Sequence, residues 1–460
     1  MSITRQLLRT ALILLAAAAA ARSANQAPTP YENEPAILAM LRELDAGACR
    51  FLPPMKTAGE KQKLVHGFAK RGPGVRDYGN SLAYAPDRET AMYCGANHGA
   101  PSRLNDVSEY HLGSNTWHLI CPPAGGDHGR VGRARGAIKK GKNVEENKAF
   151  LKKWYTEHVK VKDGYLQTIA NGGPVEPWHT WDGICYDRQA GALMWAVLDT
   201  DNTQPDRRVQ VGKTRACAKY TGQDAEKLVA RLKPSSSMYM YDPDKGRWTR
   251  QTGEGPFPYM RGMGGSLTYI PDLKKTIWYC AAQNVIPNDF AMWAYDAKTN
   301  TWEDLKPNDG KSIREMVYKT GQAPTGEVQM AYSPKDKKLV AVSKAGTWAY
   351  DIVKNEWKKM CEDKENKAHD AKTVFVYDSN ADIFLFLNAP DPWGSKRVLR
   401  SYDLKTNKWT TITPDGKMVT RPKYCGTAGY YDPNHNVFVV YNSKPRVWVY
   451  HHKKRQTHER

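Results

Sequence analysis

Several signatures of common enzyme and metal-binding classes are missing from this sequence of 460 residues. The eight cysteines form neither a CxxC pair nor a Cys/His spacing of the kind that holds zinc. A P-loop, HExxH, Gly-x-Ser-x-Gly and Ser-x-Asp-x-Gly-x-Thr-Trp are absent as well. The sequence therefore gives no support for a P-loop NTPase, a zincin, an α/β-hydrolase or a sialidase. It predicts no metal site and leaves any cofactor unidentified.

Long apolar runs are also scarce. The run Leu12–Ala21 is shorter than the ~20 residues that a bilayer span needs, and no later segment approaches that length. Arg5 and Arg9 precede this run and small residues, Ser23 and Ala24, follow it, which is the pattern of a secretory signal peptide. We expect an exported chain, secreted or periplasmic, without an integral membrane span. A buried N-terminal helix is the alternative.

Acidic residues are the third shortage. The chain has 48 Asp and Glu against 68 Lys and Arg, a formal net charge of +20. Such an excess favours acidic partners, although a basic shell also serves solubility. Nucleic acid is a poor partner for an exported chain. In an oxidising compartment the even number of cysteines allows disulfides, but the sequence does not determine their pairing.

One pattern recurs along the chain: a Tyr, usually followed by Asp, and a Trp seven positions after the Tyr. The fifth residue after the Tyr is always Asn or Gly, which tolerate the positive φ of a tight hairpin turn. Each copy therefore predicts a strand, a tight turn and a second strand. The copies are Tyr110–Trp117, Tyr241–Trp248, Tyr295–Trp302, Tyr350–Trp357 and Tyr402–Trp409.

A second hairpin precedes each of these copies. Its marker is a Tyr that ends an apolar strand and is followed by turn residues, as in Tyr269-Ile-Pro-Asp and Tyr431-Asp-Pro-Asn. Strongly β-type segments come next, for example Ile383-Phe-Leu-Phe-Leu. Two hairpins give four strands per unit with a period near 50 residues, which is the content of one propeller blade.

A hairpin followed by Tyr-Asp-x-x-x-x-x-Trp resembles the Kelch repeat, and the resemblance extends over about residues 47–455. It implies an all-β fold, a six-bladed β-propeller of the galactose oxidase/Kelch type. The double glycine of that repeat is missing: Gly95 alone stands near the expected place, and Cys280-Ala-Ala replaces it in the third unit. The chain therefore resembles a divergent member.

The last copy of the repeat is incomplete, because no Trp follows Tyr450. Strand edges are rarely left bare, so residues 47–53 are expected to supply the missing outer strand, with Phe51 at the Trp position. An N-terminal arm lying elsewhere is the alternative. The expected organisation is a signal peptide at 1–24, an arm at 25–46 and a single propeller at 47–460.

Two insertions interrupt the repeat. From Trp117 to Tyr186 the distance is 69 residues, where 20 to 30 is usual, and from Tyr186 to Tyr241 it is 55, where 18 to 26 is usual. The insertions are residues 122–177, between two blades, and residues 203–237, between the second and third strands of a blade. In a four-stranded up-and-down blade these two connections emerge on the same face, so the insertions are expected side by side. Loops on a rigid scaffold are common binding sites.

The insertions are helical and basic by composition. Helix-favouring residues with apolar spacing predict helices over about 145–160 and 224–233. Residues 122–177 hold eleven Lys and Arg against six Asp and Glu, and residues 203–237 hold eight against three. Half of the net charge of the chain therefore comes from these 91 residues. The plain alternative to a binding role is that they are solvated helical surfaces on loops.

Candidate site residues lie on the insertions and at the starts of the innermost strands, which share that face. Aromatic faces stack on sugar rings, and Arg forks bind carboxylate or sulfate, so these residue types suit an acidic polysaccharide. Packing within the inner strands is the plain alternative for each residue. The expected ligand-binding residues are Trp178, Trp181, Arg133, Arg135, Arg207, Arg208 and His369.

Three functions remain open from the sequence. The first is a binding or scaffold module for an acidic polysaccharide, an anionic envelope component or a protein. The second is a lyase on acidic polysaccharide, with Arg261 or Arg421 to neutralise the uronate, His179 as base and Tyr78 or Tyr424 as acid. The third is a copper oxidase resembling galactose oxidase, with His179 and His369 as ligands.

Overall fold

The chain forms mainly antiparallel β-sheets, which confirms the prediction of a β-rich fold. In the part of the chain that the structure describes, six sheets each contain four antiparallel strands. This computed structural model describes residues 30–74, 76, 81–95, 103–126, 128–178, 180–197, 208–236, 238–251, 255–258, 260, 264–281, 290–362, 373–389, 396–420 and 426–452.

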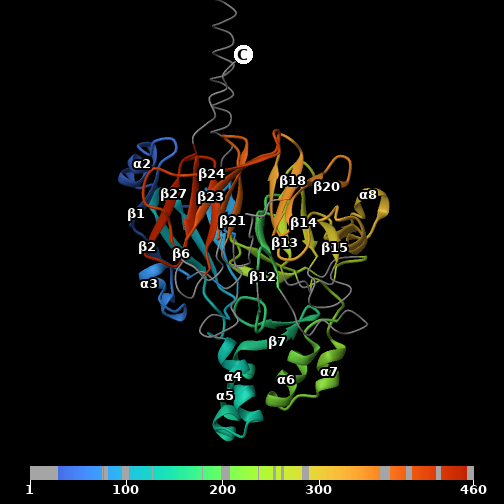
Figure 1. Cartoon of the computed structure of the whole chain (residues 1–460). Coiled ribbons are helices and arrows are strands. Elements are labelled where there is room, and N and C mark those ends of the chain that lie inside the picture. The colour runs from blue at the N-terminus through green and yellow to red at the C-terminus, as the bar shows by residue number, and fades with distance from the viewer. Residues whose placement is uncertain are drawn as a thin grey trace, which may run out of the picture.

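The sheets follow one another along the chain, and the last takes its outer antiparallel strand from the N-terminal region (Figure 1). Sheet one contains β3 (Ala83–Ala85), β4 (Thr90–Tyr93), β5 (Val107–His111) and β6 (Thr116–Cys121), with β2 (Lys56–Ala58) added parallel to β6. Sheet two contains β9 (Ile184–Asp187), β10 (Ala192–Ala196), β11 (Met238–Asp242) and β12 (Arg247–Arg250). Sheet three contains β13 (Ser266–Ile270), β14 (Lys275–Cys280), β15 (Ala291–Asp296) and β16 (Thr301–Asp304).

The remaining sheets repeat the same order of strands. Sheet four contains β17 (Gln329–Ser333), β18 (Lys338–Ser343), β19 (Gly346–Asp351) and β20 (Glu356–Cys361). Sheet five contains β21 (Val374–Asp378), β22 (Ile383–Asn388), β23 (Val398–Asp403) and β24 (Lys408–Ile412). Sheet six contains β25 (Ala428–Asp432), β26 (Val437–Tyr441), β27 (Arg446–Tyr450) and β1 (Cys49–Pro54).

Each sheet is open, and the sheets are related to one another through their first strands. β3 contacts β9, β9 contacts β13, β13 contacts β17, β17 contacts β21, β21 contacts β25, and β25 contacts β3. The first strands thus lie next to each other in cyclic order. Most of the apolar core lies between neighbouring sheets, as where Trp357 of sheet four packs with Tyr279 and Met292 of sheet three.

The repeat motif forms the second hairpin of sheets one to five. Each repeat Tyr lies opposite its Trp, as Tyr350 does opposite Trp357. The turn residue Asn355 has a φ of 55°, and Tyr350 Oη donates a hydrogen bond of 2.7 Å to its Oδ1. Asp351 Oδ1 accepts two backbone N–H groups of the turn. The motif therefore stabilises its own turn, which explains the preference for Asn and Asp.

Strand β1 pairs antiparallel with β27, so residues from both ends of the described chain share sheet six. The register differs from the one expected. Cys49 lies opposite Tyr450, in the place of the repeat Trp, while Phe51 lies opposite Trp448 and is only partly buried. Cys49 is buried in the same apolar cluster as Trp448 and Tyr450, and Gly416 packs so closely against it that a Cβ at Gly416 would meet the Cys49 carbonyl oxygen.

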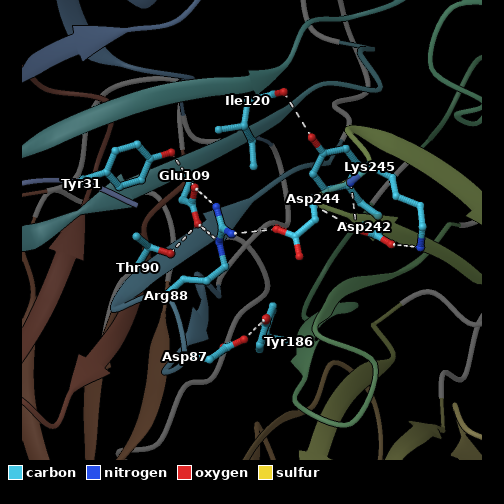
Figure 2. Close-up of polar contacts among 11 residues, drawn as sticks. Tyr31, Asp87, Arg88, Thr90, Glu109, Ile120, Tyr186, Asp242, Asp244 and Lys245 are labelled. Carbon is cyan, nitrogen blue, oxygen red and sulfur yellow. Dashed lines mark hydrogen bonds and ion pairs between the residues drawn. The ribbon is translucent and has the colours of Figure 1, made fainter. Parts of the chain in front are cut away.

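A polar cluster ties the N-terminal segment to the first two sheets (Figure 2). Glu109, which is fully buried, accepts hydrogen bonds from Arg88 (2.7 Å), Thr90 (2.6 Å) and Tyr31 (2.7 Å). Burial acts to raise the pKa of Glu109, but these donors outweigh it and hold the pKa below its usual value. Arg88 also reaches Asp244 of the next sheet at 3.5 Å.

Helices occupy the edges of the sheets and one end of the molecule. α4 (His128–Lys139), α5 (Val144–His158), α6 (Val211–Thr221) and α7 (Ala225–Ala230) gather beneath the sheets in the view of Figure 1. The hairpin of β7 (Val159–Lys162) and β8 (Tyr165–Thr168) joins them to the sheets. The other helical segments are α2 (Pro35–Arg42), η1 (Gln62–Leu64), α3 (Phe68–Arg71), η2 (Leu112–Ser114), α8 (Pro307–Gly310), α9 (Ile313–Glu315) and η3 (Met316–Thr320).

Candidate functional site

The two insertions fold together into one lobe, formed by the described residues of 122–178 and 208–236. α5 contacts α6, and both insertions contribute to a single apolar core. The helices predicted over 145–160 and 224–233 correspond to α5 and α7, whereas α4, α6 and the β7–β8 hairpin were not expected. The core residues are Val131, Ala134, Leu151, Trp154, Tyr155, Val159, Val161, Leu166, Val175, Val211, Cys217, Ala218, Leu228, Val229 and Leu232. The lobe is therefore a packed unit that can hold side chains in fixed positions.

A cavity of about 270 Å³ lies where the two insertions meet, and we call it the lobe pocket. Two of the expected ligand-binding residues, Arg135 and Trp178, meet there although 43 positions separate them in the sequence. Its wall is formed by Arg103, Arg135, Glu176, Trp178, Gly212, Lys213 and Ala216.

Arg135 and Glu176 form a bidentate ion pair in this wall. The two guanidinium nitrogens of Arg135 lie 2.6 and 2.5 Å from the two carboxylate oxygens of Glu176. Tyr155 Oη accepts a hydrogen bond from Arg135 (2.6 Å) and donates one to Glu176 (3.0 Å). Burial, followed by the Glu176 charge, raises the pKa of Tyr155, so its hydroxyl keeps its proton. The three side chains form one fixed network.

The backbone of the same segment is strained. Glu176 has a φ of 48° and Trp181 has a φ of 49°, a region that bulky residues rarely adopt. The N–H group of Glu176 donates to Nδ1 of His128 (3.0 Å), whose Nε2 bonds the Ala124 carbonyl (2.6 Å). Both ring nitrogens of His128 are thus used to hold the segment before Trp178 in place. Strain of this kind concentrates at functional sites.

Arg103 and Lys213 complete the polar wall. The Arg103 guanidinium lies 4.5 Å from the centre of the Trp178 ring, within the range of a cation–π contact. Lys213 Nζ donates to the carbonyl oxygen of Glu176 at 3.2 Å. The pocket therefore combines one indole ring with three cationic side chains and a single carboxylate.

The N-terminus of α6 adds to this positive charge. Gly212 is the second residue of α6 and forms part of the pocket wall, and no side chain caps this end of the helix. The first N–H groups of a helix carry a partial positive charge. Ring, cations and helix end together favour a ligand that combines a flat apolar face with an anionic group.

The other expected ligand-binding residues lie elsewhere. Arg133 is exposed and stands two residues from Arg135 on α4, about 200° around the helix. Arg208 donates to the carbonyl oxygen of Val229 (3.2 Å), which places it against α7. Trp181 is buried, with 4% of its surface exposed, and does not line the pocket.

All the catalytic candidates fall outside the described residues, as do two of the binding candidates. They are His179, Tyr78, Tyr424, Arg261 and Arg421 for catalysis, and His369 and Arg207 for binding.

The sequence did not single out Arg103, Glu176 or Lys213. Lys213 belongs to the second insertion, whose excess of cations was noted, but nothing in its immediate neighbours distinguishes it from the other lysines there. Arg103 lies between β4 and β5 of sheet one, outside both insertions, and still forms part of the pocket wall. These residues are brought together by tertiary contacts.

Among the described residues, no group of three or more His, Cys, Asp or Glu side chains is placed to hold a metal ion. The seven cysteines in the described ranges form no disulfide with one another, and Cys425 lies outside those ranges. The helices in the part of the chain that the structure covers include none that is long and apolar enough to cross a membrane.

Comparison with known proteins identifies no family for this chain. No protein-family model and no curated protein matches the chain. A crystal structure of an auxiliary nutrient binding protein from Bacteroides ovatus is similar in part, with a TM-score of 0.44 and 9% sequence identity. The alignment covers 87% of this chain and 76% of that one. A likeness of this degree assigns neither a family nor a ligand.

Proposed function

We propose that the chain is an exported, divergent Kelch-like propeller with six blades. Six four-stranded antiparallel sheets whose first strands meet in cyclic order support this fold, as do the five Tyr–Trp hairpins. On this proposal residues 47–460 are one propeller, completed by pairing of β1 with β27, and the insertions form a lobe on one face. The signal-like sequence at 1–24 supports secretion or a periplasmic location.

We propose further that the protein is a binding module for an acidic polysaccharide, with the lobe pocket as its site. The observation that carries this function is the convergence of Arg103, Arg135 and Lys213 beside the Trp178 ring in a cavity of about 270 Å³. Uronate and sulfated sugars offer the matching groups, a ring face for Trp178 and an oxyanion for the cations.

The roles within the pocket differ. Arg135 is already bound by both oxygens of Glu176, so its main role is to position the segment that carries Trp178. We assign the anion contact to Lys213 and Arg103 because both line the pocket and the Arg103 guanidinium lies over the Trp178 ring. The lyase and copper-oxidase alternatives depend on residues outside the described ranges, and no observation on the described residues favours them.

A charge reversal in the pocket tests this function. Titration of the mature protein with polygalacturonate should give binding that neutral dextran does not give. Lys213→Glu should weaken it about tenfold or more, which corresponds to ~1.4 kcal/mol. Because exposed charges contribute, binding should also weaken as the salt concentration rises past ~0.15 M, where the screening length is ~8 Å.

Lys219→Glu is the matched control, because it lies on the same helix, outside the pocket wall, and changes the net charge equally. Its affinity for polygalacturonate should stay within about twofold of the wild type. Equal losses in the two variants would mean that overall charge, not the pocket, binds the polymer. Equal affinity for dextran and polygalacturonate would refute the proposed function.

A further inference from the structure

A second cavity, of about 210 Å³, lies among the first strands of sheets one to four, and we call it the axial cavity. It does not share a residue with the lobe pocket. Its wall comes from β3, β9, β13 and β17 and the residues beside them, which are Ser81, Leu82, Ala83, Tyr84, Asp182, Ile184, Cys185, Tyr186, Arg188, Leu267, Thr268, Tyr269, Pro271 and Met330.

Asp182 lies at the inner end of the axial cavity, just before β9. Its carboxylate accepts hydrogen bonds from the Ser81 hydroxyl and from Ser266 Oγ (2.5 Å), and a longer one from the Met330 N–H group (3.4 Å). These donors come from sheets one, three and four. The inner end is therefore a rigid polar floor joined to three sheets.

The outer end is aromatic and reaches solvent. Tyr186 Oη donates to Asp87 at 2.7 Å, and the Tyr84 ring stacks on another tyrosine ring with centroids 5.6 Å apart, so both rings are held in place. Tyr269 is partly exposed, and Arg188 is exposed beside it. Arg188 forms no hydrogen bond or ion pair with the residues that the structure describes, is exposed and lines the cavity, so its guanidinium donors are available to a ligand there.

The charge of this cavity differs from that of the lobe pocket. Asp182 and Arg188 are the charged side chains of its wall, and their signs cancel. Ring faces, hydroxyl groups, one carboxylate and one guanidinium in a half-apolar cavity are the groups that bind the C–H faces and hydroxyls of a sugar. A strongly charged ligand of either sign would be attracted by one of these two side chains and repelled by the other, so the wall favours an uncharged ligand.

We propose that the axial cavity is a second binding site, for a single uncharged sugar residue. The site is independent of the acidic ligand assigned to the lobe pocket. Its floor is Asp182 with the Ser81 hydroxyl, its aromatic wall is Tyr84, Tyr186 and Tyr269, and Arg188 donates to the sugar hydroxyls at the mouth.

Ligand-observed NMR with the methyl glycosides of glucose, galactose and mannose tests this site. Saturation transfer from the wild-type protein to at least one glycoside should be seen at millimolar concentration. Tyr269→Leu removes a ring face and Arg188→Met removes the mouth donors, and each should weaken binding about tenfold. Both residues are at least partly exposed, so the melting temperature should change little.

Tyr318→Leu is the matched control, because Tyr318 is 55% exposed and lies outside the cavity wall. It should bind the glycoside as the wild type does, and so should Lys213→Glu. If none of the three glycosides shows transfer, or if Tyr269→Leu binds like Tyr318→Leu, the axial site is refuted. Loss of binding in Lys213→Glu would assign the sugar to the lobe pocket instead and would also overturn the proposal.

Discussion

The repeat tryptophans differ in how deeply their rings are buried. Trp357 has 2% of its surface exposed and packs near Tyr279 and Tyr350, with ring centroids 5.3 Å from each. Its Nε1 donates to the sulfur of Met292 at 3.0 Å. Trp409, at the equivalent position of sheet five, is only partly buried. The same motif therefore contributes unequally to the free energy of unfolding.

Replacing Trp357 with Ala should lower the free energy of unfolding by about 3–5 kcal/mol, because the lost ring leaves a cavity between sheets three and four. Trp409→Ala should lower the free energy of unfolding by a clearly smaller amount, because part of the Trp409 ring already contacts water. Urea unfolding of both variants measures the difference. Equal losses would show that burial of the ring does not determine its contribution.

Asp182 gives the protein a pH-dependent contribution to stability. Burial raises the pKa of its carboxyl group to about 6, although hydrogen bonds from Ser266, Ser81 and Met330 act to lower it. The unfolded chain loses this proton near the usual pKa of ~3.9. Between about pH 4 and 6 the folded state therefore binds more protons than the unfolded state, and stability falls as the pH rises.

Asp182→Asn should remove this contribution. The free energy of unfolding of the variant, relative to the wild type, should rise from pH 4 to pH 6 and then stay constant. Loss of a hydrogen-bond acceptor shifts the whole profile by a constant amount and does not change its slope. Urea unfolding at half-unit pH intervals measures both profiles. Parallel profiles would show that Asp182 titrates alike in both states.

Among the elements, the lobe helices show the limits of local propensity. α5 has the composition of a stable helix, with Glu145 and Glu146 in its first turn. α4 contains three glycines, which lower helix propensity by about 1 kcal/mol each relative to Ala. It is helical because Val131 and Ala134 are buried in the core shared by the two insertions.

Strand β1 is the element on which sheet six depends. Leu52 is fully buried, and β1 covers an edge of β27 that would otherwise be open. A chain that starts after Pro54 should therefore show no cooperative unfolding transition by calorimetry. A chain that starts at Pro30 is the control and should melt as a chain that starts at Asn25 does. Identical melting temperatures for the two chains would show that β1 is dispensable.

At the scale of the whole molecule, the sheets and the lobe are two packed parts with separate apolar cores. Neighbouring sheets bury their faces against one another, and the polar cluster around Glu109 links sheets one and two to the N-terminal segment. The lobe adds a separate core and an excess of positive charge at one end. The two proposed sites follow this division, one in the lobe and one among the first strands.

The sequence by itself determined the hairpins, the insertions and the charge. Tyr350, Asp351 and Asn355 interact within a few residues of one another, so their pattern predicts the turn without knowledge of the rest of the chain. The boundaries of the insertions follow from the same repeat, because a gap in a regular spacing is visible in the sequence alone.

The tertiary structure decided the rest. Cys49 rather than Phe51 lies opposite Tyr450, because packing against residues more than 350 positions away sets that register. Lys213 and Arg103 meet at Trp178 only because two insertions share a core. Contacts between residues far apart in the chain depend on shape and burial, which a local pattern does not encode. The repeat could therefore be predicted from the sequence, whereas both cavities could not.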